Sequence, residues 1–193
     1  MLVLASASPR RQELLRNAGI SFEVQPAHIP EDPQPGELPG ACAERLAREK
    51  ARAVFSRRPG DIVLGADTIV VVEGEILGKP RDAADAMRML GRLSGKTHQV
   101  TTGVCLTGPG EGRHGGEAFE DVRSETTRVT VATLTEGEIR DYVASEEPMD
   151  KAGAYAIQGR ASRWIPQIAG DYFNVVGLPV ALVWKMLAAH GVF

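Results

Sequence analysis

Two hydrophobic runs rich in β-branched residues stand close together in the first half of the chain, at Ile62–Leu64 and Ile69–Val72. Continuous apolar runs bounded by turn residues are typical of buried strands. The residues Glu73–Glu75 predict a turn, and Ile76–Leu77 predict a short returning strand. We therefore expect a hairpin around which the rest of the chain is organised.

A polar interruption, Gly65–Thr68, separates the two runs and contains Asp67. An unpaired buried charge is costly, so Asp67 needs a cation, a metal or water at the edge of a cleft. Gly65 indicates a close approach by a ligand or by another backbone segment, and the hairpin would bring Lys79 near Asp67. The alternative is a simple bend in which Asp67 makes an Asx turn, and this stretch alone does not separate the two interpretations.

The N-terminal pattern predicts a strand over residues 1–5, followed by a helix that begins after the N-cap Ser8 and ends at Gly19. Arg10 and Arg11 occupy the first turn of this helix, where cations oppose the helix dipole. Sequences tend to break local rules of this kind at functional sites. A hydroxyl-rich turn and a helix N-terminus with two arginines suit a phosphate group. The alternative is a solvated basic end of a surface helix.

The remaining pattern alternates helices with strands, which predicts an α/β domain with a mixed sheet. Helices are expected at about 40–55, 82–93, 135–144 and 179–190, and strands at 98–106, 122–134, 161–168 and 172–176. Long loops are expected at 23–39 and at the glycine-rich stretch 107–120. Lys50 falls on the apolar face of the helix at 40–55, where it either reaches water or pairs with a carboxylate or phosphate.

Composition narrows the class of protein. The 193 residues are 43% hydrophobic and 24% charged, with a net charge of −3, which is typical of an ordinary globular domain and argues against a protein that coats nucleic acid. No hydrophobic run approaches the length of a membrane span, and the first residues lack the pattern of a signal peptide. We expect one domain over residues 1–193, a cytoplasmic location, and no nucleic-acid or membrane partner.

Seven sequence blocks carry a resemblance to a known family. They are ASASPRR (Ala5–Arg11), LAREKA (Leu46–Ala51), LGADTIV (Leu64–Val70), GKPRD (Gly78–Asp82), LSGKTHQV (Leu93–Val100), DKAGAYAIQG (Asp150–Gly159) and NVVGLP (Asn174–Pro179). With these blocks in this order, the chain resembles the Maf family of nucleoside triphosphate pyrophosphatases. The resemblance implies a fold similar to that of inosine triphosphatases, with a twisted mixed sheet flanked by helices and two lobes around a central cleft.

The resemblance also implies an activity and a set of site residues. The implied reaction converts a nucleoside triphosphate, most of all dTTP and UTP, into the monophosphate and pyrophosphate with a divalent cation, Mg²⁺ or Mn²⁺. The family has also been connected with inhibition of septum formation in bacteria. Asp67 is the implied proton acceptor, and Asp67 and Glu31 are the implied metal ligands. Selection of the base is assigned to Arg10, Thr68 and Gln158. Binding of the triphosphate is assigned to Ser6, Ser8, Arg11, Lys50 and Lys79.

Elementary chemistry supports this assignment. Cleavage between the α- and β-phosphates needs cations that stabilise the negative charge distributed over the phosphate oxygens. It also needs an acidic group that orients or deprotonates water. Whether Asp67 binds metal, accepts a proton or does both is open at this point. No Walker P-loop is present. Two alternatives remain, a pyrophosphatase for another or modified nucleotide and a non-catalytic nucleotide sensor of cell division. The sequence leaves the oligomeric state open, and a homodimer is one of the alternatives.

Overall fold

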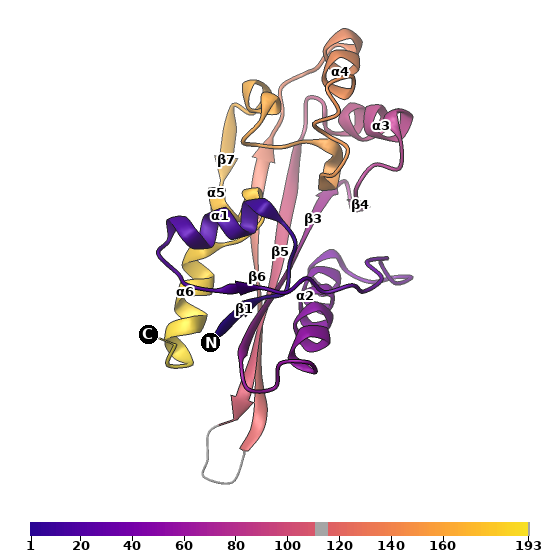
Figure 1. Cartoon of the computed structure of the whole chain (residues 1–193). Coiled ribbons are helices and arrows are strands. Elements are labelled where there is room, and N and C mark those ends of the chain that lie inside the picture. Colours follow the sequence, from indigo (N-terminus) through magenta and orange to yellow (C-terminus); the bar gives the residue numbers. More distant parts are fainter. Residues whose placement is uncertain (111–115, 193) are drawn as a thin grey trace. The chain divides into compact units, whose positions relative to one another are not determined.

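The computed structural model describes residues 1–110 and 116–192 (Figure 1). These residues form two compact units. The first unit contains the described residues of Met1–Asp67, Thr102–Glu125 and Gly177–Phe193, and the second contains Thr68–Thr101 and Thr126–Val176. Each unit is therefore built from segments that lie far apart in the sequence.

The strands form one mixed sheet with the order β2-β1-β3-β5-β6-β7, and β4 pairs with β3 off this path. The strands are β1 (Leu2–Leu4), β2 (Glu23–Val24), β3 (Ile62–Val72), β4 (Glu75–Leu77), β5 (Thr97–Gly110), β6 (Gly116–Thr130) and β7 (Gln167–Ala169). β1 runs parallel to β2 and β3, whereas the β3–β4 and β6–β7 pairs are antiparallel. The expected α/β class with a mixed sheet is confirmed.

The helices begin largely where the sequence predicts. They are α1 (Pro9–Asn17), α2 (Pro39–Phe55), α3 (Ala83–Leu93), α4 (Glu136–Val143), α5 (Tyr172–Val176) and α6 (Val180–Ala189), with 3₁₀ turns η1 (Ala152–Ala154) and η2 (Arg160–Trp164). The side chains of Ser8, Asp82 and Thr135 accept hydrogen bonds from backbone N–H groups at the starts of α1, α3 and α4, as expected of N-caps. Within the described part of the chain, no helix is long and apolar enough to cross a membrane.

The central hairpin differs from its prediction in one respect. β3 is a single strand over Ile62–Val72, so Gly65–Thr68 is not a bend and the Asx-turn interpretation of Asp67 is wrong. Pairing with β1 runs up to this stretch, where Ala5 N donates to Leu64 O at 2.8 Å. A buried carboxylate is tolerated within the strand because a lysine lies beside it.

The glycine-rich stretch at 107–120 is the second difference. The expected loop is largely strand, because β5 continues to Gly110 and β6 begins at Gly116. Thr107 Oγ1 donates to the carbonyl oxygen of Phe119 at 2.8 Å, which ties the two strands together there. The middle of the expected loop, residues 111–115, lies outside the described residues.

Two short segments were assigned the wrong structure from their sequence. Residues 161–168 were expected to be a strand, but they contain most of η2 and only the beginning of β7. Residues 172–176, expected as a strand, form α5. Asp171 Oδ1 accepts from Phe173 N at 2.8 Å, and this local hydrogen bond favours a helical start over an extended chain. The long loop expected at 23–39 is shortened by β2 and by the start of α2 at Pro39.

One buried cluster in the core of the first unit is made of small side chains. It consists of Val3, Ala5, Ala47, Ala51, Val54, Val63 and Cys105. Apart from Ala5, which directly follows β1, these residues come from β1, α2, β3 and β5, so the helix lies directly on the strands. Small side chains allow two backbones to come close, and this closeness positions the charged residues described next.

Candidate active site

Two glycines bring α2 close to the strands of the first unit (Figure 1). A side chain at Gly65 would lie 2.8 Å from the backbone nitrogen of Ala51 and would also overlap the carbonyl oxygen of Ala47. A side chain at Gly103, on β5, would overlap the backbone of Ala43. The close approach expected at Gly65 is therefore made by a helix backbone, because only glycine leaves room for it.

This contact places Lys50 of α2 beside Asp67 of β3. Asp67 follows Gly65 by two residues, so both lie on the face of the strand that α2 covers. Lys50 Nζ lies 2.6 Å from Asp67 Oδ1 and 2.5 Å from Glu31 Oε1. The side chains of Lys50 and Asp67 are 8% and 11% exposed, whereas that of Glu31 is 44% exposed. Two carboxylates therefore share one ammonium group at the margin of the core.

Arg11 is a second buried cation in the same unit. Its Nε donates to the carbonyl oxygen of Gly177 at 2.8 Å, and its Nη1 donates to Ser6 Oγ at 3.2 Å. Burial lowers the pKa of Arg11, while the negative charges of Asp67 and Glu31 oppose this shift. Because these charges act on Arg11, its guanidinium belongs to the same charged cluster as Lys50.

Arg10 and Ser8 complete the N-terminus of α1. Ser8 Oγ accepts from the backbone nitrogen of Arg11 at 3.5 Å, and Ser8 N donates to Ser6 Oγ at 3.2 Å. The half-buried Arg10 adds a positive charge that lowers the pKa of Arg11 further. The first turn of α1 contains no acidic residue. Two repelling cations at a helix N-terminus are stabilised when an anion binds between them.

Three predicted site residues belong to the second unit. Thr68 is half-buried in β3, Lys79 is exposed shortly after β4, and Gln158 is exposed between η1 and η2. Gly153 N donates to the carbonyl oxygen of Gly78 at 3.0 Å, which links the segment that carries Gln158 to the one that carries Lys79. The expected proximity of Lys79 to Asp67 stays a prediction.

The carboxylates of Glu31 and Asp67 are the residues that could hold a metal ion. The described residues contain no group of three His, Cys, Asp or Glu side chains arranged for a metal. Both carboxylates nevertheless approach one cation, Lys50 Nζ, within 2.6 Å. Mg²⁺ in nucleotide enzymes is usually held by one or two carboxylates together with water and substrate phosphates. The pair of carboxylates therefore fits a divalent cation.

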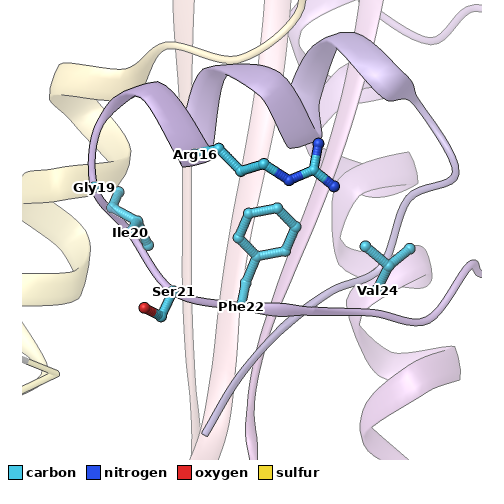
Figure 2. Close-up of a pocket in the computed structure, with 6 residues that line it drawn as sticks. All are labelled: Arg16, Gly19, Ile20, Ser21, Phe22 and Val24. Atoms are coloured by element: carbon cyan, nitrogen blue, oxygen red, sulfur yellow. The ribbon is translucent and has the colours of Figure 1, made fainter.

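A shallow depression of about 420 Å³ lies beside α1 (Figure 2). It is lined by Arg16, Gly19, Ile20, Ser21, Phe22 and Val24. The guanidinium of Arg16 lies 5.6 Å from the centre of the Phe22 ring. The lining contains no carboxylate and shares no residue with the charged cluster, so the depression adds nothing to the candidate site.

Comparison with known protein families shows which family the chain belongs to. The family model described as "Maf-like protein" matches residues 1–190. The chain belongs to the Maf family. The dTTP/UTP pyrophosphatase of Koribacter versatilis (strain Ellin345) is 59% identical over 191 residues, which cover 99% of this chain and 95% of that protein. The dTTP/UTP pyrophosphatase of Symbiobacterium thermophilum is 55% identical over 190 residues, covering 98% and 94% respectively.

A solved structure supports the fold of this Maf-family chain. The Staphylococcus aureus Ham1 protein superimposes with a TM-score of 0.53 over 98% of each chain, at 15% sequence identity. At this identity the likeness concerns the fold alone.

Sequence reasoning missed one residue of the candidate site, Gly177. Its φ of 132° is readily adopted only by glycine, and its carbonyl oxygen accepts from Arg11 Nε. The NVVGLP block that contains Gly177 was recognised, but sequence alone did not indicate a partner 166 residues away. A conformational requirement of this kind leaves no signal beyond the glycine itself.

Proposed function

We propose that this Maf protein hydrolyses dTTP and UTP to the nucleoside monophosphate and pyrophosphate. The observation that carries the proposal is the buried Lys50–Asp67 pair beside Arg11, in a chain that matches proteins named dTTP/UTP pyrophosphatase over nearly its whole length. A buried carboxylate next to two cations suits the attack of water on a polyphosphate.

The residues of the first unit divide the work of hydrolysis. Water supplies the new oxygen, its proton moves to a carboxylate, and the anhydride bond between the α- and β-phosphates breaks as pyrophosphate leaves. We assign the proton to Asp67, because it is the buried carboxylate of the cluster and is oriented by Lys50. Lys50 and Arg11 balance the negative charge of the phosphates, and Ser6 orients Arg11 through its hydroxyl.

A divalent metal fits the two carboxylates. Glu31 and Asp67 would hold it, and Glu31 is exposed enough to move toward an incoming metal–nucleotide complex. When bound, the metal supplies Lewis-acid neutralisation of phosphate charge. Lys50 would then be released from one or both carboxylates and could turn to a phosphate oxygen, for which an ammonium group is a suitable donor.

The residues of the second unit are assigned to the nucleotide as well. Lys79 is exposed and carries a positive charge that suits a phosphate, so we assign it to the triphosphate. Thr68 and Gln158, together with Arg10 of the first unit, are assigned to the base. A glutamine amide offers one donor and one acceptor, which complements the adjacent carbonyl and N–H shared by thymine and uracil.

The decisive experiment is a product assay over dTTP, UTP, CTP and modified nucleotides, with Mg²⁺, with Mn²⁺ and after chelation with EDTA. We expect metal-dependent release of pyrophosphate, with dTTP and UTP as the best substrates. Release of orthophosphate with a nucleoside diphosphate would refute the proposed cleavage site. Tight nucleotide binding without any product would favour the nucleotide-sensing regulator instead. Turnover of a modified nucleotide far above dTTP and UTP would favour the alternative substrate.

Three further expectations belong to this proposal. They are a single Maf-like domain over residues 1–193, a cytoplasmic location where free nucleotides are hydrolysed, and a homodimer as the alternative to a monomer. Sedimentation of the purified full chain at several concentrations tests the last of them, because a dimer shifts toward monomer on dilution.

A further inference from the structure

One partly buried hydrogen-bond network in the second unit holds both ends of the short turn that carries Gln158. Tyr142, fully buried on α4, donates its hydroxyl to Glu147 Oε1 at 2.9 Å and accepts from the backbone nitrogen of Ala156 at 3.1 Å. The two carboxylate oxygens of Glu147 accept from the backbone nitrogen of Arg160 at 3.0 and 3.2 Å. Ala156 and Arg160 each lie two residues from Gln158, so one pair of side chains fixes both ends of the turn.

The turn itself is shaped around Glu147. Gly159 N donates to the carbonyl oxygen of Ala156 at 3.0 Å, which closes the turn. A side chain at Gly159 would lie 2.9 Å from Glu147 Oε2 and closer still to the rest of the carboxylate. The φ of Gly159 is −97°, which any residue adopts, so glycine is needed here for space rather than for backbone conformation. The ring of Trp164 packs edge-to-face against the ring of Tyr142, with 5.3 Å between the two ring centres.

We infer that Tyr142 and Glu147 are positioning residues that set the choice of base through Gln158. This inference rests on the proposed function, in which Gln158 pairs with the base. A glutamine amide distinguishes uracil from cytosine only when its donor and acceptor are held in register with the ring. If the turn moves, or if the amide rotates by half a turn, the reversed donor and acceptor suit cytosine instead. Tyr142 and Glu147 hold the backbone on either side of Gln158, and this restricts movement of the turn, so that the side chain of Gln158 meets the base from a fixed position.

The first test removes the Tyr142 hydroxyl. In Tyr142→Phe, which loses both hydrogen bonds of the hydroxyl, we expect the ratio of kcat/KM for dTTP to that for CTP to fall about 10-fold, the order of magnitude of a net hydrogen-bond contribution. The kcat for dTTP should change little, because the charged cluster of the first unit is untouched. The matched control is Tyr155→Phe, which removes another buried hydroxyl, one bonded to His98 Nε2 at 2.8 Å. This control should keep the wild-type ratio, whatever it does to thermal stability.

A second variant moves Glu147 without removing any hydrogen-bonding group. In Gly159→Ala, the new methyl group displaces the Glu147 carboxylate, so the dTTP-to-CTP ratio should fall as in Tyr142→Phe. Hydrogen exchange of the Arg160 amide should accelerate in this variant, and that of Ala156 should accelerate in Tyr142→Phe. This variant keeps the inference open to test even if Tyr142→Phe does not fold.

A double-mutant cycle shows whether the effect passes through Gln158. In a Gln158→Ala background, Tyr142→Phe should cause no further fall in the dTTP-to-CTP ratio. An equal fall with and without Gln158, an unchanged ratio in both Tyr142→Phe and Gly159→Ala, or an equal fall in Tyr155→Phe would each overturn the inference while wild-type activity stands. A wild-type protein that releases no pyrophosphate from dTTP or UTP overturns the proposed function itself, and the inference with it.

Discussion

Lys50 Nζ lies 2.6 Å from Asp67 Oδ1, although the two residues are 17 positions apart in the sequence. Both side chains are buried. The contact depends on Gly65, which lets α2 lie against β3. The Lys50–Asp67 pair in the candidate active site therefore depends on a third residue, Gly65.

Asp67→Asn should keep the fold and lower kcat for dTTP by about 10²-fold or more, the range expected when a general base is lost. The measurement is pyrophosphate release under saturating nucleotide and metal, together with a thermal unfolding curve. Asp61→Asn is the matched control, because Asp61, like Asp67, pairs with a cationic side chain, here that of Arg58, but lies outside the cluster. Normal turnover by Asp67→Asn would show that the carboxylate is structural.

Lys50→Met should destabilise the protein by about 3 kcal/mol, because it leaves the buried Asp67 carboxylate without its nearest cation. The double variant Lys50→Met/Asp67→Asn should regain part of this loss, since the unpaired charge is then gone. Urea unfolding of the two single variants and the double variant gives the coupling energy. Strictly additive effects would mean that the pair contributes nothing to stability.

Gly65→Ala should destabilise the protein and reduce its activity, because the new methyl group meets the α2 backbone at Ala47 and Ala51. Gly91→Ala is the control, since Gly91 lies in α3 with nothing within 4 Å of the added carbon. This helical substitution should stabilise the protein by up to about 1 kcal/mol. Thermal unfolding and pyrophosphate release are measured on both variants, and wild-type values for Gly65→Ala would contradict the close approach of α2.

Gln158→Ala should lose most of the preference for dTTP and UTP over CTP, because the side chain that pairs with the carbonyl and N–H is gone. Each unsatisfied polar group costs about 1–3 kcal/mol in the wild-type complex with cytosine, so the wild-type preference should be strong. The thymine methyl group contributes about 1–3 kcal/mol at most, which leaves UTP as an accepted substrate. The measurement is kcat/KM for the three nucleotides, and an unchanged dTTP-to-CTP ratio would show that Gln158 does not read the base.

His98 should make the protein less stable in mild acid. Burial lowers the pKa of this histidine to about 4, and its Nε2 faces the Tyr155 hydroxyl. Between pH 6.5 and 4 the unfolded chain binds the proton and the folded protein does not, so the free energy of unfolding falls as the pH falls. The loss approaches about 3 kcal/mol at the low end of this window. Urea unfolding at several pH values should show this slope in wild type and in His190→Gln, and a reduced slope in His98→Gln.

The local pattern of the sequence determined most of the elements. Ser8, Asp82 and Thr135 are N-caps in the structure because capping depends on a few neighbouring residues. The strands at Ile62–Leu64 and Ile69–Val72 were predicted for the same local reason, and the ordered blocks were sufficient to indicate the Maf family. The errors occurred where the local signal is weak, at 107–120 and 172–176, because glycine-rich and short apolar stretches are compatible with more than one structure.

The tertiary structure decided which charged residues meet. The sequence required a partner for Asp67, but only the packing of α2 on β3 selected Lys50, and the path of the chain before α2 brought Glu31 to the same ammonium group. Likewise, the sequence placed two arginines at the start of α1, and the fold joined Arg11 to Gly177, 166 residues away. Pairings between distant residues depend on how close two backbones can approach, and that distance is set by the fit of side chains such as those around Gly65 rather than by any local pattern.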